Sequence, residues 1–115
     1  MKENKLADLS MDLAINTVKL CEKIKGHYAL TNQLERSVTS IGANIREANY
    51  ASSRADFVSK LHISLKECYE TEFWFELFVK SELATGNEIK ALYYECGTIR
   101  RILVTSINTA KQEMK

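Results

Sequence analysis

Apolar residues recur every three or four positions along most of this 115-residue chain, a spacing that is typical of amphipathic helices. Four such segments are separated by short polar or glycine-containing stretches, and none shows the alternation that marks a strand. Proline, which costs about 3 kcal/mol in a helix interior, is absent. The pattern therefore predicts four helices, at about residues 4–25, 32–51, 54–83 and 87–112.

Local signals support these boundaries. Gly26 follows a lysine-rich turn, which is a helix-stop signature. Asn32 stands three residues before Glu35, and Ser53 stands three residues before Asp56, so both pairs are expected to cap the start of a helix. Because short loops make consecutive helices antiparallel, we expect one all-α domain, an up-down-up-down four-helix bundle over residues 1–115.

Composition narrows the function classes. Sixteen basic residues face fifteen acidic ones, so the net charge gives no global argument for binding nucleic acid or membrane. There is no apolar run long enough to span a membrane, and the first ten residues lack the apolar core of a signal peptide, so a cytoplasmic location is expected. Cys21, Cys68 and Cys96 lie on apolar stripes and are expected to be buried thiols.

Residues 73–79, "FWFELFV", are apolar on every side of the predicted third helix, whereas a helix in a monomeric bundle buries only one stripe. We therefore expect part of this segment to meet another copy of the chain. The alternative is that loops and the chain's own ends cover it. The candidate oligomer interface consists of Phe73, Trp74, Phe78, Tyr93 and Tyr94.

Short polar residues form a second stripe beside the apolar stripe of the second helix, and a similar line follows the third helix. If the two helices are neighbours, these lines are expected to face each other and to hydrogen-bond, since buried polar groups need partners. Such a network fixes the register between helices without any catalysis; a solvated flank is the alternative. The stripe consists of Arg36, Ser37, Ser40, Asn44, Glu47, Ser64, Glu67 and Glu70. On the third helix, Thr71 continues the polar line of Ser64 and Glu67.

The segment from Arg36 to Phe78 resembles the signature of the four helix bundle protein family. This family is also called the 23S rRNA-intervening-sequence protein family, because some members are encoded inside insertions within bacterial 23S rRNA genes. The matching positions are Arg36-Ser37, Ser40-Ile41, Asn44-Ile45 and Glu47, followed by Asp56-Phe57, Ser64-Leu65, Glu67, Glu70 and Trp74. One position departs from the pattern: many members carry glycine where this chain has Ala48.

The resemblance implies a small bacterial protein whose bundle is left-handed and whose copies assemble into rings, with pentamers the usual state. A distant relative, the accessory protein of diversity-generating retroelements, binds nucleic acid and a reverse transcriptase. That protein is markedly basic and this chain is not. Five arginines remain candidate nucleic-acid contacts, with pairing to nearby glutamates as the alternative: Arg36, Arg46, Arg54, Arg100 and Arg101.

Three functions stay open at this point: an oligomeric module that binds RNA or a ribonucleoprotein, a ring-shaped protein–protein scaffold, and an enzyme. The enzyme is the least supported. His27 and His62 have no acid or cysteine at catalytic or metal-ligating spacing. Glu67 and Glu70 form an E-x-x-E, but the E-x-x-H of di-metal bundles is missing. We therefore expect no catalytic residues, no metal, no cofactor, no small-molecule substrate and no membrane partner.

Overall fold

The computed structural model describes residues 4–114, and within that range it contains helices and no strands. The helices are α1 (Asn4–Glu22), α2 (Tyr28–Asn49), α3 (Arg54–Lys80) and α4 (Asn87–Glu113). The expected all-α class is confirmed. The predicted single domain over 1–115 also includes residues 1–3 and 115, which lie outside the described residues.

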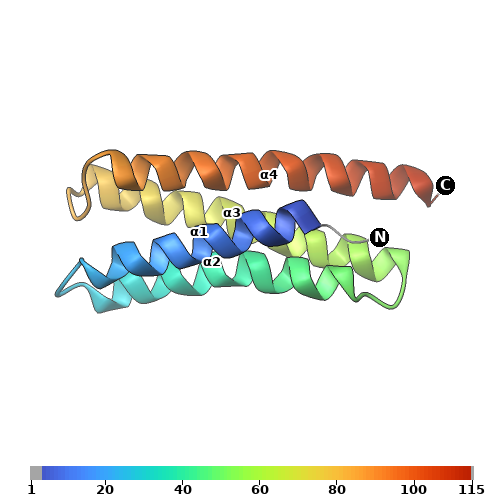
Figure 1. The fold of residues 1–115 in the computed structure, drawn as a ribbon, viewed down its shortest axis with the longest axis horizontal. Helices are drawn as coiled ribbons and strands as arrows, with labels where there is room; N and C mark the ends of the chain where they lie inside the picture. Colours follow the sequence, from blue (N-terminus) through green and yellow to red (C-terminus); the bar gives the residue numbers. More distant parts are fainter. Residues whose placement is uncertain (1–3, 115) are drawn as a thin grey trace.

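The chain reverses direction at each of its three loops, so that consecutive helices lie side by side (Figure 1). Contacts join α1 to α2, α2 to α3, α3 to α4 and α1 to α4, which closes the four helices into a bundle. The bundle measures 49 × 19 × 19 Å. The left-handed sense stays a prediction. None of the helices in residues 4–114 is long and apolar enough to cross a membrane.

The core runs along the axis between the four helices and is built from the apolar stripes. Its largest fully buried side chains come from every helix, and they are Leu6, Leu13, Leu34, Val38, Ile41, Ile45, Leu61, Phe75, Phe78, Ile89, Ile99 and Leu103. Complete removal of such a side chain from water stabilises a fold by roughly 1.5–3 kcal/mol. Because each helix contributes to the same interior, the core fixes how α2, α3 and α4 present their outer residues.

The start of α2 differs from the prediction. The helix begins at Tyr28 rather than near residue 32, so Asn32 is not its N-cap and the proposed pairing with Glu35 is wrong. The carbonyl of His27 already accepts hydrogen bonds from the N–H groups of Leu30 and Thr31, at 3.1 and 3.0 Å. The buried Thr31 belongs to the core stripe, and its burial extends the helix by one turn before Asn32.

The start of α3 agrees with the prediction, because the Ser53 side chain accepts a hydrogen bond from the N–H of Asp56 at 3.0 Å. Its end comes earlier than expected, at Lys80 instead of residue 83. Glu82 has a left-handed backbone, with φ of 63°. This turn lets the N–H of Leu83 donate to the carbonyl of Phe78 at 3.0 Å, a pairing that terminates helices.

α1 also ends before the predicted boundary, at Glu22 instead of residue 25. Beyond it, the N–H groups of Lys23 and Ile24 donate to carbonyls three residues back, at 3.0 and 3.1 Å. Such tighter bonds are common where a helix finishes. Gly26 then adopts φ of 86°, a left-handed conformation that glycine reaches without steric penalty.

Candidate functional site

The two polar lines predicted on the second and third helices face each other across the α2–α3 contact. Thr71 donates a hydrogen bond to the Ser37 hydroxyl at 2.8 Å, and Ser37 donates to the carbonyl of Leu34 at 3.2 Å. Ser64 donates to the carbonyl of Ile41 at 2.9 Å. Because Ser37, Ser64 and Thr71 are fully buried, this part of the predicted network is confirmed.

Farther along the α2 line, Ser40 and Asn44 are partly buried and Glu47 is exposed. Asn44 donates to the carbonyl and the hydroxyl of Ser40, at 2.9 and 3.1 Å. Glu47 pairs with Lys60 of α3 at 2.9 Å. Thus Ser40 and Asn44 do not cross to the neighbouring helix, while Glu47 does.

Arg36 lies at the edge of this α2–α3 contact. Its guanidinium donates to Glu67 at 3.5 Å and to Glu70, and the indole N–H of Trp74 donates to the same Glu70 carboxylate at 3.1 Å. These hydrogen bonds, first from Arg36 and then from Trp74, lower the pKa of Glu70. The pKa of Arg36 is raised, chiefly by its hydrogen bond to Glu70.

Two more of the five candidate arginines also have carboxylate partners. Arg54 pairs with Glu113 at 3.2 Å and joins the start of α3 to the end of α4. Arg100 pairs with Glu72 at 2.8 Å, and both side chains are largely buried. The hydrogen bond to Glu72 is the main reason that the pKa of Arg100 is raised. The pairing alternative therefore holds for Arg36, Arg54 and Arg100.

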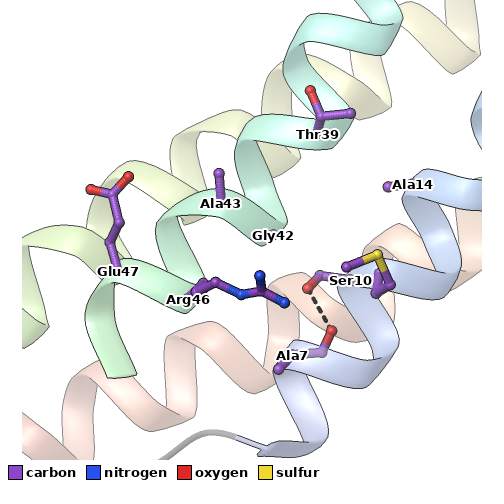
Figure 2. Close-up of a pocket in the computed structure, with 9 residues that line it drawn as sticks. Ala7, Ser10, Ala14, Thr39, Gly42, Ala43, Arg46 and Glu47 are labelled. Carbon is purple, nitrogen blue, oxygen red and sulfur yellow. Dashed lines mark hydrogen bonds between the residues drawn. The ribbon is translucent and has the colours of Figure 1, made fainter. Parts of the chain in front are cut away.

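For the remaining two arginines the structure records no ion pair within residues 4–114. Arg101 is exposed on α4 and donates to the hydroxyl of Thr98 at 3.2 Å. Arg46 is exposed on α2 and extends toward α1 (Figure 2). These two guanidinium groups are the ones whose charge is available to an external anion.

The aromatic segment of α3 divides between the interior and the surface. Phe75 and Phe78 are completely buried within the chain, so Phe78 is removed from the candidate oligomer interface. Trp74 is half-buried against the core. Phe73 is 58% exposed, and its ring packs edge-on against Trp74 with centroids 5.0 Å apart.

The two tyrosines predicted to join this interface lie on α4. Tyr94 is 71% exposed and Tyr93 is 36% exposed, and their rings meet edge-on with centroids 6.0 Å apart. With Val79 and Lys90 they line a shallow hollow of about 300 Å³ between α3 and α4. These two tyrosines and Phe73 are the exposed members of the candidate oligomer interface, and we call the three residues the aromatic surface.

Sequence reasoning missed a groove between α1 and α2 (Figure 2). Its volume is about 440 Å³, and its lining residues are mostly small: Ala7, Ser10, Met11, Ala14, Thr39, Gly42, Ala43, Arg46 and Glu47. The signal was present, because Ala7, Ser10 and Ala14 follow helical spacing on α1 and small side chains leave space between helices. Met11 at the groove and Ile15 nearby on α1 are 48% and 44% exposed.

The three cysteines are buried and free, as their apolar positions predicted. Burial, followed by the charge of Glu35, raises the pKa of Cys21 to about 12. The pKa of Cys96 is raised as well, first by its hydrogen bond with Cys68 and then by burial. Within residues 4–114, no three His, Cys, Asp or Glu residues are grouped to hold a metal ion.

Comparison with known proteins identifies the family to which the chain belongs. The model of the 23S rRNA-intervening sequence protein family matches residues 2–105. The chain belongs to the 23S rRNA-intervening sequence protein family. No curated protein gives a match.

A solved structure extends the comparison to the fold of this family. It is a crystal structure of a protein of unknown function from the S23 ribosomal protein family of Bacteroides thetaiotaomicron, with 40% sequence identity and a TM-score of 0.86. The match covers 94% of this chain and 99% of that one. A similarity this complete means that the four-helix arrangement is shared along nearly the whole length.

Proposed function

We propose that this 23S rRNA-intervening sequence protein is a non-enzymatic module that assembles with copies of itself and binds RNA or a ribonucleoprotein. The observation that carries the proposal is the aromatic surface. Phe73 and Tyr94 stay 58% and 71% exposed although the interior is already filled by Phe75 and Phe78. Aromatic side chains that stay exposed on a small protein are typical of surfaces that bind another macromolecule.

Assembly follows from the size and character of this exposed surface. Each large aromatic side chain that is removed from water contributes roughly 1.5–3 kcal/mol, so several of them supply a firm contact between copies. The family resemblance makes a left-handed bundle and a ring of five the expected arrangement, in a bacterial cytoplasm. Non-closing contacts between unlike surfaces would give filaments instead.

RNA binding is supported by the family's name and by the arginines that lack ion pairs within the described residues. A net charge of +1 makes a single copy a weak ligand for a polyanion. Assembly multiplies each unpaired guanidinium around the ring, and several simultaneous phosphate contacts give binding that is measurable and salt-sensitive. We therefore expect RNA affinity to depend on the oligomer rather than on the isolated chain.

Light scattering coupled to a sizing column tests the assembly, with a mass several times that of one chain as the expected result. Gel-shift experiments with structured RNA over a range of salt concentrations then test the second half of the proposal. We expect binding at low salt that weakens steeply as salt is added. A monomer at micromolar concentration would remove the basis for the proposal, since no multi-copy surface would exist.

The second candidate function is a protein–protein scaffold without nucleic-acid contact. It is favoured by the ion pairs of Arg36, Arg54 and Arg100, which neutralise three of the five arginines within the chain. An oligomer that fails to shift RNA even at low salt would support this scaffold and contradict the RNA-binding module. A separate part of the proposal is that the protein carries no catalytic metal. Metal analysis of the purified protein tests it.

A further inference from the structure

Two arginine side chains of α4 converge over a glycine in the same helix. A methyl group added at Gly97 would lie 3.3 Å from Nη1 of Arg101 and 3.5 Å from Nη2 of Arg100. Gly97 is itself buried, because these side chains cover it. Both guanidinium groups therefore lie against the backbone of α4 at Gly97, and a larger residue at this position would displace them outward.

The charges at this spot do not balance. Glu72 supplies one carboxylate, whose Oε2 accepts from Nε of Arg100 at 2.8 Å and lies 4.0 Å from the methyl position at Gly97. Arg101 is recorded with one hydrogen bond, from Nη2 to the Thr98 hydroxyl at 3.2 Å. The Glu72 carboxylate thus pairs with Arg100, and no ion pair of Arg101 is found within residues 4–114, which leaves the charge of Arg101 for an anion from outside the chain.

An exposed aromatic ring stands beside the two arginines. The guanidinium carbon of Arg100 lies 5.6 Å from the ring centroid of Tyr69 on α3, within the range of a cation–π contact. Tyr69 is 53% exposed as a residue, and Glu72 follows it by one turn of the same helix. The site therefore combines charged donors with a flat apolar face, as proteins that bind single strands do.

We propose that Arg100, Arg101, Gly97 and Tyr69 form a binding site for one phosphodiester of unpaired RNA and the base next to it. The inference rests on the proposed function and names the RNA class and the residues. A phosphodiester carries the single negative charge that the cluster lacks, and guanidinium donors match its oxygens. The neighbouring base stacks on Tyr69, which requires that it be free of a duplex.

The experiment measures fluorescence anisotropy of a labelled oligouridine with the wild-type oligomer, over a range of salt concentrations. The same oligouridine annealed to oligoadenosine is the duplex probe. We expect the single strand to bind more tightly. Arg101→Gln should weaken single-strand binding by about tenfold, the effect of losing one charge-assisted contact, and should reduce the salt slope by roughly 0.7. Arg101→Lys keeps the charge but loses the planar fork, so we expect an intermediate loss.

Tyr69→Leu separates stacking from charge, because it should weaken single-strand binding while leaving the salt slope unchanged. Lys19→Gln is the matched control: it removes one exposed positive charge from α1, a helix that carries none of the four residues of the site. Circular dichroism and light scattering on each variant establish that fold and oligomer are kept.

Each outcome decides a different statement. If wild-type protein binds neither probe at low salt, the RNA half of the proposed function fails and this inference fails with it. If wild type binds but Arg101→Gln and Lys19→Gln behave alike, the proposed function stands and this site is overturned. Equal affinity for the duplex, or no effect of Tyr69→Leu, would overturn the stacking of an unpaired base.

Discussion

The hydroxyl groups of Ser37 and Thr71 show how single residues fix the contact between α2 and α3. Both side chains are completely buried, and they are joined by a hydrogen bond of 2.8 Å. Such a bond adds only about 1 kcal/mol in net terms, but leaving one partner unsatisfied costs roughly 1–3 kcal/mol. A shift of either helix along its axis would break the pair, so its main effect is on register.

A double-mutant cycle tests this pair. Thr71→Val keeps the shape and removes the donor, and Ser37→Ala removes the acceptor; we expect each to lower the free energy of unfolding by about 1–3 kcal/mol. The double variant should lose clearly less than the sum, because no buried group is then left without a partner. Urea denaturation monitored by circular dichroism measures all four proteins. Additive losses would contradict a coupled pair.

The Arg36–Glu70–Trp74 group makes stability depend on pH. The pKa of Glu70 is held below its usual 4.5 by hydrogen bonds from Arg36 and Trp74. Its contribution is therefore complete above pH 4.5 and is lost as the pH falls through the lower folded-state pKa. Glu70→Gln should reduce stability at neutral pH, and the gap to wild type should close in acid.

Denaturant titrations between neutral pH and acid measure this difference. Glu95→Gln is the control, because it makes the same charge change on an exposed part of α4 where no ion pair is recorded within residues 4–114. A wild-type and Glu70→Gln difference that stays constant with pH would show that the hydrogen bonds do not act on the ionised carboxylate.

At the scale of the element, two glycines lie inside helices for different reasons. Gly42 of α2 faces α1, and a methyl group there would lie 3.2 Å from Oγ and 3.5 Å from Cβ of Ser10. The helix backbones approach closely at this point, which offsets the propensity cost of glycine, about 1 kcal/mol relative to alanine. Gly97 of α4 meets the tips of two arginine side chains and, at 4.0 Å, a carboxylate oxygen of Glu72, and these side-chain ends can move.

The two glycines therefore respond differently to alanine. Gly97→Ala should raise the free energy of unfolding by up to about 1 kcal/mol, because Arg100 and Arg101 shift by a few tenths of an ångström without strain. Gly42→Ala should give no such gain, since Ser10 is buried and hydrogen-bonded to the carbonyl of Ala7 at 3.1 Å. Thermal unfolding of both variants is the measurement. A destabilised Gly97→Ala would mean that the covering arginines are rigidly held.

At the scale of the whole molecule, the sequence predicted four helices and their order because apolar spacing along each helix is a local signal. The start of α2 was misplaced because Asn32 and Glu35 match a capping pattern while the burial of Thr31, a tertiary effect, decides the boundary. The sequence predicted which helix faces carry polar residues, but not which residues form hydrogen bonds. Spacing placed Ser37 and Thr71 on facing stripes, and the packing of the helices determines which two hydroxyl groups meet.

The aromatic segment of α3 shows a second limit of sequence reasoning, which is that spacing does not show how much of a helix its neighbours cover. Counting apolar residues around α3 suggested that Phe78 faces outward, yet Phe75 and Phe78 both fill the interior. A helix that contacts two neighbours, as α3 contacts α2 and α4, covers a wider arc than the single stripe assumed from sequence. The exposed part of the candidate oligomer interface is therefore smaller than predicted, and its most exposed residues are Phe73 of α3 and Tyr94 of α4.

That narrower surface allows a direct test of assembly. If copies bury Phe73 and Tyr94 against one another, the double change Phe73→Ser and Tyr94→Ser removes several kcal/mol from the contact and should shift the protein from oligomer to monomer in light scattering. Neither side chain belongs to the filled core, so the helical content should be unchanged. Tyr28→Ser is the matched control, because Tyr28 is 61% exposed and belongs to α2, a helix that carries no residue of the aromatic surface. A double variant that keeps the wild-type mass would place the contact elsewhere, with the α1–α2 groove and its exposed Met11 as the next surface to change.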